Sequence, residues 1–181
     1  MKIHLETERL ILRPVESRDA QGFFIMDSNR EVQRYLGDNI PRNANDSLKI
    51  IEMIQAQYRE HGVGRLAVTL KKNGSFLGWC GLKKAITPRN GYEEYYDLGY
   101  RFQEEHWARG YATESSRAVL AHGFEQLELI EVIGEFDTEN QRSAHVLQKL
   151  GFRFLSEFQE NERTYHWTHL TRDSWTDSLA L

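Results

Sequence analysis

The segment 107–113, with the sequence WARGYAT, has residue types and an order that suit the binding of a phosphate group. It follows a strand-like stretch and opens a helix-like one. A helix start leaves unpaired N–H groups and a partial positive charge, and both attract anions. Gly110 lets the backbone approach a ligand closely, Ala112 leaves it room, and Arg109 can add a charged donor. An ordinary strand-to-helix loop with a turning glycine is the simpler alternative.

Two other phosphate-binding motifs are excluded at this position. A P-loop requires a glycine-rich spacing that ends in lysine, and residues 107–113 lack both. The dinucleotide fingerprint Gly-x-Gly-x-x-Gly is also missing. Any phosphate site here is therefore of another kind.

A second segment, residues 140–152, begins with Asn140 and Ser143 and ends in Leu-Gly-Phe. Asn140 can cap a helix, and Ser143 alone would then be a solvated hydroxyl. The combination is more informative than either residue, because a phosphate-type loop is followed by a strand, this Asn and Ser, and a glycine stop.

Composition limits the classes of function. The chain has 181 residues and a formal net charge of -4, which fits one domain, residues 1–181, with a real core. Mild acidity argues against a protein built to hold a nucleic acid backbone. The lone Cys80 lies in an apolar run and is expected to be a buried small hydrophobe, and a cysteine-based metal site or an internal disulfide is excluded. No metal is expected.

Neither a secretion signal nor a membrane span is indicated. The first residues, MKIHLE, do not open an apolar region, and no run approaches the roughly 20 apolar residues that cross a bilayer. We expect a cytoplasmic protein that does not bind membranes, as a monomer or homodimer.

The periodicity predicts a mixed α/β fold. Strands are expected at residues 7–14, 65–70, 75–82, 95–102, 130–136, 152–158 and 164–170, with an Asn73-Gly74 hairpin turn. Helices are expected after Asp19, from a cap at residues 45–47, at residues 112–127 and at residues 141–150. Residues 83–94 are polar and are expected to form an exposed loop.

Together these segments resemble the GNAT superfamily of acetyl-CoA-dependent N-acetyltransferases, and within it the ribosomal-protein alanine N-acetyltransferase-like branch. The resemblance covers nearly the whole chain. It rests on residues 6–14, 77–82, 97–100, 107–114 and 140–152. It implies a single domain with a mostly antiparallel twisted sheet, helices on both faces and a central β-α-β unit for the cofactor.

The resemblance also implies site residues. The backbone of Tyr100, Arg101, Phe102 and Gln103 would pair with the pantetheine arm of acetyl-CoA, where two strands splay apart. The pyrophosphate would be held by the amides of Arg109, Gly110, Tyr111, Ala112 and Thr113. Asn140 would hydrogen-bond the pantetheine, and Ser143 would lie near the thioester sulfur.

The chain departs from the superfamily at Leu147, where many members carry a tyrosine that protonates the departing thiolate. Ser143 is the replacement candidate. We expect direct attack by the amine, with Asp97 as the general base. By strand parity Asp97 shares a face with Arg101, so a plain ion pair between them is the equal alternative. Other candidate bases are Glu135, Asp137 and Glu139.

The expected function is acetyl transfer from acetyl-CoA to a primary amine, either a protein N-terminus or a small molecule. The alternative is a non-catalytic module that binds acyl-CoA as a sensor, because the tyrosine is missing. The chain lacks the basic stripe that a nucleic-acid binder would need.

Overall fold

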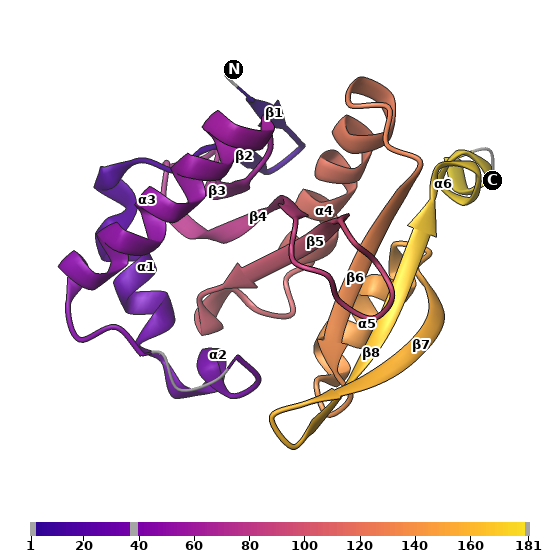
Figure 1. Ribbon diagram of the computed structural model, residues 1–181. Helices are drawn as coiled ribbons and strands as arrows, with labels where there is room; N and C mark the ends of the chain where they lie inside the picture. The colour runs from indigo at the N-terminus through magenta and orange to yellow at the C-terminus, as the bar shows by residue number, and fades with distance from the viewer. Residues whose placement is uncertain (1–2, 37–39, 180–181) are drawn as a thin grey trace.

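The computed structural model describes residues 3–36 and 40–179, which form one eight-stranded sheet with helices on both faces (Figure 1). The strands are β1 (Leu5–Glu6), β2 (Leu10–Pro14), β3 (Arg65–Leu70), β4 (Phe76–Ala85), β5 (Tyr95–Phe102), β6 (Glu131–Asp137), β7 (Arg153–Glu160) and β8 (Arg163–Thr171). Their order across the sheet is β1-β2-β3-β4-β5-β6-β8-β7. Among the described strands, β5 and β6 make the one parallel pair.

The helical elements are η1 (Ser17–Asp19), α1 (Ala20–Asp27), α2 (Arg30–Gln33), α3 (Ala44–His61), η2 (Glu104–His106), α4 (Tyr111–Ala121), η3 (His122–Gln126), α5 (Gln141–Lys149) and α6 (Arg172–Leu179). The fold is therefore the predicted mixed α/β class. Two short helices, α2 and α6, were not predicted. Residues 112–127 were predicted as one helix, but the helix begins at Tyr111 and its end widens into the π-helical turn η3.

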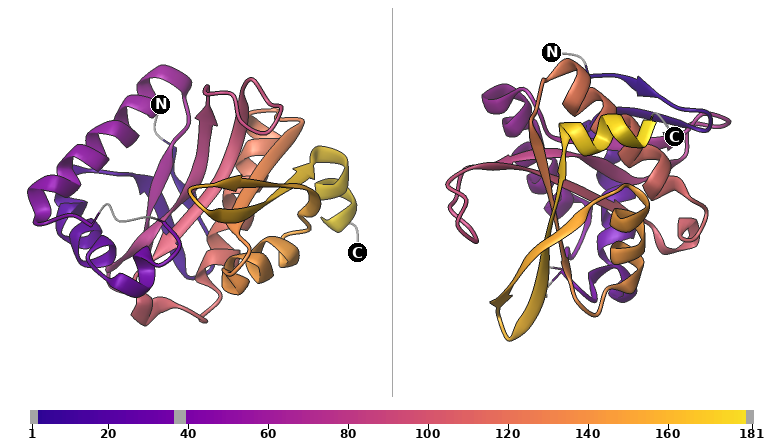
Figure 2. Two further views of the ribbon diagram at one scale, coloured as in Figure 1. Left: turned by 60° about the horizontal axis from the view of Figure 1, so that its bottom comes forward. Right: turned by 90° about the vertical axis from the view of Figure 1, so that its right-hand side faces the viewer.

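Alternating side chains of the strands build two cores on opposite faces of the sheet. Leu66 and Val68 of β3 point to the face that α4 covers, where they join Leu120 and Phe124. Ala67, between them, faces α1 and α3. Because a strand alternates its side chains, one β3 strand serves both cores. The two views in Figure 2 show the helices of residues 20–61 and of residues 111–126 on opposite sides of the sheet.

The start of α3 corrects one prediction. Asn43 is the cap, and its side-chain oxygen accepts from the amides of Asn45 at 2.9 Å and Asp46 at 3.3 Å. The predicted caps at residues 45–47 lie instead inside the first turn. Gly62 ends the helix with a left-handed φ of 69°.

The predicted exposed loop at residues 83–94 is shorter than expected, because its first three residues extend β4. The aromatic residues Tyr92 and Tyr95 beside it cover the sheet. Their rings lie 5.5 Å and 4.9 Å from the buried ring of Trp167. The β7–β8 hairpin extends beyond the rest of the sheet (Figure 2, right).

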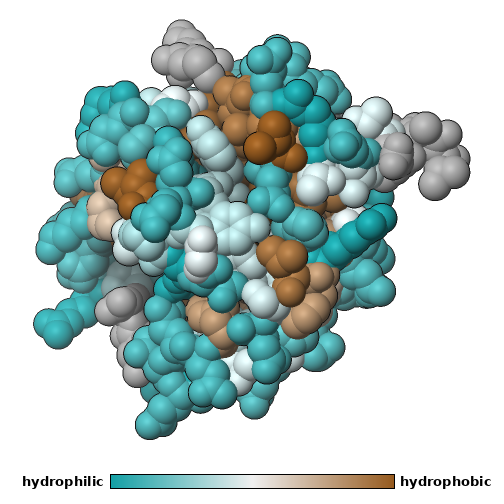
Figure 3. Space-filling model, turned by 45° about the vertical axis from the view of Figure 1, so that its right-hand side comes forward, coloured by the Kyte–Doolittle hydropathy of each residue, from teal (hydrophilic) through white to brown (hydrophobic). Residues whose placement is uncertain are grey.

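The face turned toward the viewer in Figure 3 is mostly polar, and its apolar side chains lie in separate small groups. None of the helices in the described ranges is both long enough and apolar enough to cross a bilayer.

Candidate functional site

The centre of the sheet opens between β5 and β6. The two strands pair at a single position, Asp97 with Ile133, and then diverge toward their carboxyl ends (Figure 1). Past this point β5 has a neighbour only on its β4 side. The divergence leaves an edge of unpaired backbone groups inside the sheet, which is a place where an extended ligand can add like a strand.

The backbone groups that face this opening come from alternate residues of β5. The amide of Gln103 donates to the carbonyl of Leu77 in β4 at 2.9 Å. Because backbone groups alternate along a strand, Arg101 also faces β4, while Tyr100 and Phe102 face the opening. Of the four predicted pantetheine-pairing residues, these two direct their backbone groups to the split.

The loop after β5 brings the predicted phosphate-binding amides to the start of α4. Ala108 and Gly110 both have left-handed backbone, with φ of 57° and 81°, and so turn the chain tightly into the helix. Gly110 is the N-cap, so the amides of Tyr111, Ala112 and Thr113 lie in the first turn, where a helix has no acceptors for them. Three unpaired amides at a helix start fit a phosphate group.

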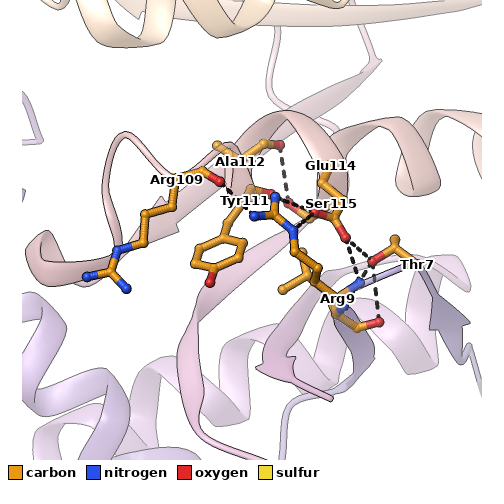
Figure 4. Close-up of polar contacts among 8 residues, drawn as sticks. Thr7, Arg9, Arg109, Tyr111, Ala112, Glu114 and Ser115 are labelled. Atoms are coloured by element: carbon orange, nitrogen blue, oxygen red, sulfur yellow. Dashed lines mark hydrogen bonds and ion pairs between the residues drawn. The ribbon is translucent and has the colours of Figure 1, made fainter. Parts of the chain in front are cut away.

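Contacts from the turn between β1 and β2 brace this helix start (Figure 4). The carboxylate of Glu114 accepts from the hydroxyl of Thr7 at 2.5 Å and from the amide and guanidinium of Arg9 at 3.0 Å and 2.7 Å. Arg9 also donates to the carbonyl of Arg109 at 3.0 Å and covers the ring of Tyr111. The loop geometry therefore depends on residues a hundred positions earlier in the chain.

Arg109 is exposed, and Figure 4 shows its side chain extended away from the brace. Its guanidinium is thus placed at the surface beside the loop. Such a flexible cation can reach an anion bound at the helix start.

The predicted pair of Asn140 and Ser143 lies at the start of α5, across the opening from β5. The side-chain oxygen of Asn140 accepts from the amide of Ser143 at 3.1 Å, so Asn140 is the helix cap. The hydroxyl of Ser143 lies 2.9 Å from the hydroxyl of Tyr100. Burial raises the pKa of Tyr100, so its phenol stays protonated at ordinary pH.

Trp107 joins the end of β5 to α5. Its indole N–H donates to the carbonyl of Phe102 at 2.8 Å, and the guanidinium of Arg142 lies 4.6 Å from its ring. The carbonyl of Phe102 is thereby already bonded within the protein. Trp107 thus sets the distance between the loop and the first turn of α5.

Asp97 lies on the opposite face of the sheet, and its partner is not the predicted one. It forms an ion pair with Arg65 of β3, which also donates to the carbonyl of Asp97 at 2.8 Å. Arg101 pairs instead with Asp27 of α1 at 2.7 Å. The alternative of an Asp97–Arg101 ion pair is therefore wrong, because each residue has a partner from another element.

Glu135 of β6 is the second carboxylate on this face. Burial raises its pKa, and the nearby charge of Asp97 raises it further. Arg89, from the loop before β5, donates to both of its oxygens at 3.1 Å and 2.9 Å and to Glu160 at 2.6 Å. Glu135 is thus held beside the opening and has an increased affinity for a proton.

Asp137, another of the candidate bases, has a structural role. Asp137 is buried, pairs with Arg163 at 2.7 Å and accepts from the amide of Glu139 at 2.9 Å. Cys80 is fully buried beside Ser116, and burial raises the pKa of its thiol. The prediction of a buried cysteine is confirmed.

Comparison with known proteins identifies the family. The model of the acetyltransferase (GNAT) domain matches residues 9–153. The chain belongs to the GNAT acetyltransferase family. A relative from Bacillus subtilis, named uncharacterized N-acetyltransferase YoaA, is 32% identical over 149 residues, which is 82% of each chain.

Solved structures show the same fold at lower identity. The GNAT acetyltransferase from Bacillus anthracis has a TM-score of 0.80 and 21% identity, with 94% of this chain and 99% of that one covered. The ribosomal-protein-S5-alanine acetyltransferase from Vibrio fischeri has a TM-score of 0.77 and 16% identity, with 96% and 98% covered. The family match and these structures together identify an acetyltransferase of the GNAT fold, and the predicted resemblance to the GNAT superfamily is confirmed, while the resemblance to the ribosomal-protein branch stays a prediction. The donor in this family is acetyl-CoA.

Several residues of this GNAT site were missed from the sequence. They are the brace residues Thr7, Arg9 and Glu114, the side chain of Trp107 with Arg142, and the side chain of Tyr100. Each acts across elements far apart in the chain, so local spacing carried no signal for it. Arg65, the partner of Asp97, was also missed. Gly99 offered an indirect signal for it, since a side chain at position 99 would collide with the Arg65 guanidinium.

Proposed function

We propose that this acetyltransferase transfers the acetyl group of acetyl-CoA to a primary amine by direct attack. The observation that carries the proposal is the β5–β6 opening, because it joins the two faces of the sheet. The amides of α4 and the hydroxyl of Ser143 lie on one side, and Asp97 and Glu135 lie on the other. A donor and an amine can then meet in the opening from opposite faces.

On the donor side, the first-turn amides of α4 would hold the pyrophosphate, with help from Arg109. The backbone groups of Tyr100 and the amide of Phe102 would bond the pantetheine, since the carbonyl of Phe102 already accepts from Trp107. Ser143 would donate a hydrogen bond to the departing sulfur, where negative charge develops. Bound acetyl-CoA supplies the activated acyl group, and the protein orients it.

On the amine side, a carboxylate must remove the ammonium proton before attack. Asp97 is paired with Arg65 and Glu135 with Arg89, but burial and the charge of Asp97 still raise the pKa of Glu135, which suits a base working nearer neutral pH. We therefore favour Glu135 for the proton transfer. Asp97 then contributes by raising the pKa of Glu135.

The acceptor is a primary amine on a protein N-terminus or a small molecule. A pocket of ≈ 400 Å³ at the end of β5 is lined by apolar Ile25 and Met26 and by the carboxylates of Glu104 and Glu105. An acidic rim over an apolar floor suits a cationic amine. The names of two similar proteins fit an amine acceptor. One structural neighbour is named a ribosomal-protein-S5-alanine acetyltransferase, and a relative from Aspergillus fumigatus, 26% identical, is named FsC-acetyl coenzyme A-N(2)-transacetylase.

The first test is calorimetric titration with acetyl-CoA of the wild type, Gly110→Glu and Gly110→Asn. Both variants bear a side chain at the left-handed position, which asparagine tolerates best, but only glutamate adds a negative charge. We expect Gly110→Glu to lose binding while the folded Gly110→Asn retains most of it. Equal binding by all three proteins would remove the α4 amides from the site.

Thiol release on a panel of N-terminal peptides, polyamines and amino sugars then tests catalysis. Acetylation of any of these amines, with one CoA released for each acetyl group, supports the enzyme. Tight binding of acetyl-CoA without turnover on the whole panel would favour the sensor alternative, which the buried Leu147 in place of tyrosine makes worth testing.

A further inference from the structure

The side chain of Tyr100 has no role in the function proposed so far, although it ends in the donor side of the opening. Tyr100 lies on β5, and its hydroxyl meets the N-terminal turn of α5. It lies 2.9 Å from the hydroxyl of Ser143 and 3.2 Å from the carbonyl of the same residue. Both partners are partly buried, so bulk water competes little for this contact.

We propose that Tyr100 is a positioning residue, whose phenol donates to the hydroxyl oxygen of Ser143 and so aims the serine hydrogen at the departing sulfur. This inference rests on the proposed role of Ser143. It assigns a function to the Tyr100 side chain that is separate from the backbone contact expected of this residue.

The argument begins with the directions of the hydrogen bonds. A tyrosine hydroxyl has one hydrogen, and burial keeps it attached because it raises the pKa of Tyr100. This hydrogen has two acceptors on Ser143, the carbonyl oxygen at 3.2 Å and the hydroxyl oxygen at 2.9 Å, and the shorter contact favours the hydroxyl oxygen. When the phenol hydrogen points there, the serine hydrogen must point elsewhere. The serine amide is already bound to Asn140 at 3.1 Å, so the start of α5 fixes the backbone of Ser143.

The second step concerns strength. A hydroxyl that accepts a hydrogen bond becomes a better donor, because chains of hydrogen bonds polarise one another. Ser143 then makes a stronger bond to a sulfur that gains negative charge. Tyr100 would act through this bond and would not touch the substrate.

The atoms and charges balance without a proton leaving Tyr100. The amine nitrogen forms a bond to the acyl carbon, the carbon–sulfur bond breaks, and its electron pair moves to sulfur. The carboxylate on the opposite face takes the ammonium proton before attack and passes it to water, and it then accepts the second proton, which the nitrogen loses as the amide forms. Ser143 keeps its proton and stabilises the thiolate, which is protonated by water after release.

A binding experiment tests the inference without any acceptor. The thiol pKa of bound CoA is measured from the ultraviolet absorbance of the thiolate, on wild type, Tyr100→Phe, Ser143→Ala and the double variant. We expect wild type to lower this pKa relative to free CoA, since hydrogen bonds favour the charged form. Tyr100→Phe should shift it back toward the free value, and the double variant should match Ser143→Ala.

Tyr96→Phe is the matched control, because Tyr96 lies on the same strand and the same face. It removes the same atom without touching Ser143. We expect its bound-thiol pKa to equal that of wild type. A merely structural effect of losing a phenol from β5 would appear in both variants as a lower melting temperature.

With an active acceptor, the same four proteins form a double-mutant cycle. We expect Tyr100→Phe to lower kcat by about 3- to 30-fold in the wild-type background and by less than about twofold in Ser143→Ala. The loss should grow with thioesters of more basic thiols, which depend more on help at sulfur.

The outcomes separate this inference from the proposed function. If CoA binds and amines are acetylated, but Tyr100→Phe changes neither the bound-thiol pKa nor kcat, only the positioning role is overturned. Equal losses of kcat in both backgrounds would also overturn it, because Tyr100 would then act independently of Ser143. If wild type binds no CoA, both proposals fail together.

Discussion

Glu114 and Arg9 lie 105 residues apart in the chain and form a bidentate contact, in which the backbone amide and the guanidinium of Arg9 both donate to one carboxylate. This contact fixes the first turn of α4 against the edge of the sheet. It matters for function because the same turn carries the proposed phosphate-binding amides.

Glu114→Gln should therefore reduce both stability and donor affinity. Burial alone would raise the pKa of Glu114, but the hydrogen bonds from Thr7 and Arg9 outweigh it and the pKa is lowered. A lowered pKa gives stability that is present above the unfolded value of 4.5 and is lost as pH falls through the folded value. Urea unfolding should show that the free energy of unfolding falls by about 1 kcal/mol at pH 7, a small value because Arg9 is partly exposed. This loss should shrink toward pH 3. Replacing exposed Glu8 by glutamine is the control, and an equal loss there would contradict the brace.

If Glu135 is the base, its pKa sets the pH at which the rate falls on the acidic side of the pH–rate profile. Because burial and then Asp97 raise its pKa, kcat/KM should begin to fall at a pH higher than an ordinary carboxylate would give. Asp97→Asn removes the second cause, so the limb should move to lower pH. Glu160 is exposed, and its charge contributes less to the pKa of Glu135, so Glu160→Gln should move the limb less. A limb that stays in place in Asp97→Asn and persists in Glu135→Gln would rule out Glu135 as the base.

The raised pKa of Glu135 also predicts how stability depends on pH: ionisation of Glu135 should raise the rate but lower the stability of the fold. A raised folded pKa means that the favourable contribution is present below the unfolded value and is lost as pH rises through the folded value. Glu135→Gln, which cannot ionise, should therefore lose less stability than wild type between pH 4 and pH 8. If the free energy of unfolding changed with pH in the same way for both proteins, ionisation of Glu135 would not destabilise the fold.

Ser143→Ala should slow acetyl transfer while leaving the donor bound. A hydrogen bond to a charged atom contributes about 1.5–3 kcal/mol, so we expect kcat to fall by about 10- to 100-fold. The alanine amide can still bond to Asn140, so the dissociation constant of acetyl-CoA should change by less than about twofold. Single-turnover kinetics with calorimetry separates the two. Unchanged turnover would remove Ser143 from the mechanism.

Arg101→Met should destabilise the protein without weakening acetyl-CoA binding. It leaves the buried Asp27 without its partner, and burial already raises the pKa of that carboxyl. We expect a loss of about 3 kcal/mol at pH 8 that is smaller at pH 4, where Asp27 takes a proton. The double variant Asp27→Asn with Arg101→Met should recover part of it. A loss of donor affinity in the folded variant would instead place the Arg101 side chain in the cofactor site.

The sequence predicted the elements better than the contacts between them. Periodicity located β5, α4, β6 and α5, because each has a strong pattern and a clear turn or cap at its end. Parity placed Asp97 and Arg101 on one face, as observed, but it could not show that Arg65 comes from two strands away. Partners across a sheet depend on register, and register is set by packing that one strand does not reveal.

The candidate site follows the same rule. The α4 amides could be predicted, because a helix start binds anions by its local geometry. Tyr100 was predicted only for its backbone, since nothing in its strand shows that α5 begins beside its hydroxyl. Helix α2 has only four residues, too few for a readable period, and α6 has only Trp175 and Leu179 as apolar residues in the sequence RDSWTDSL.

The two cores on opposite faces of the sheet have an evolutionary consequence. The residues proposed to hold acetyl-CoA belong to the face of α4 and α5, while α1 and α3 pack on a separate core. Mutations that reshape the α1–α3 layer can therefore accumulate without disturbing the donor site. A lineage built on this plan can exchange one acceptor amine for another while its acetyl-CoA chemistry stays the same.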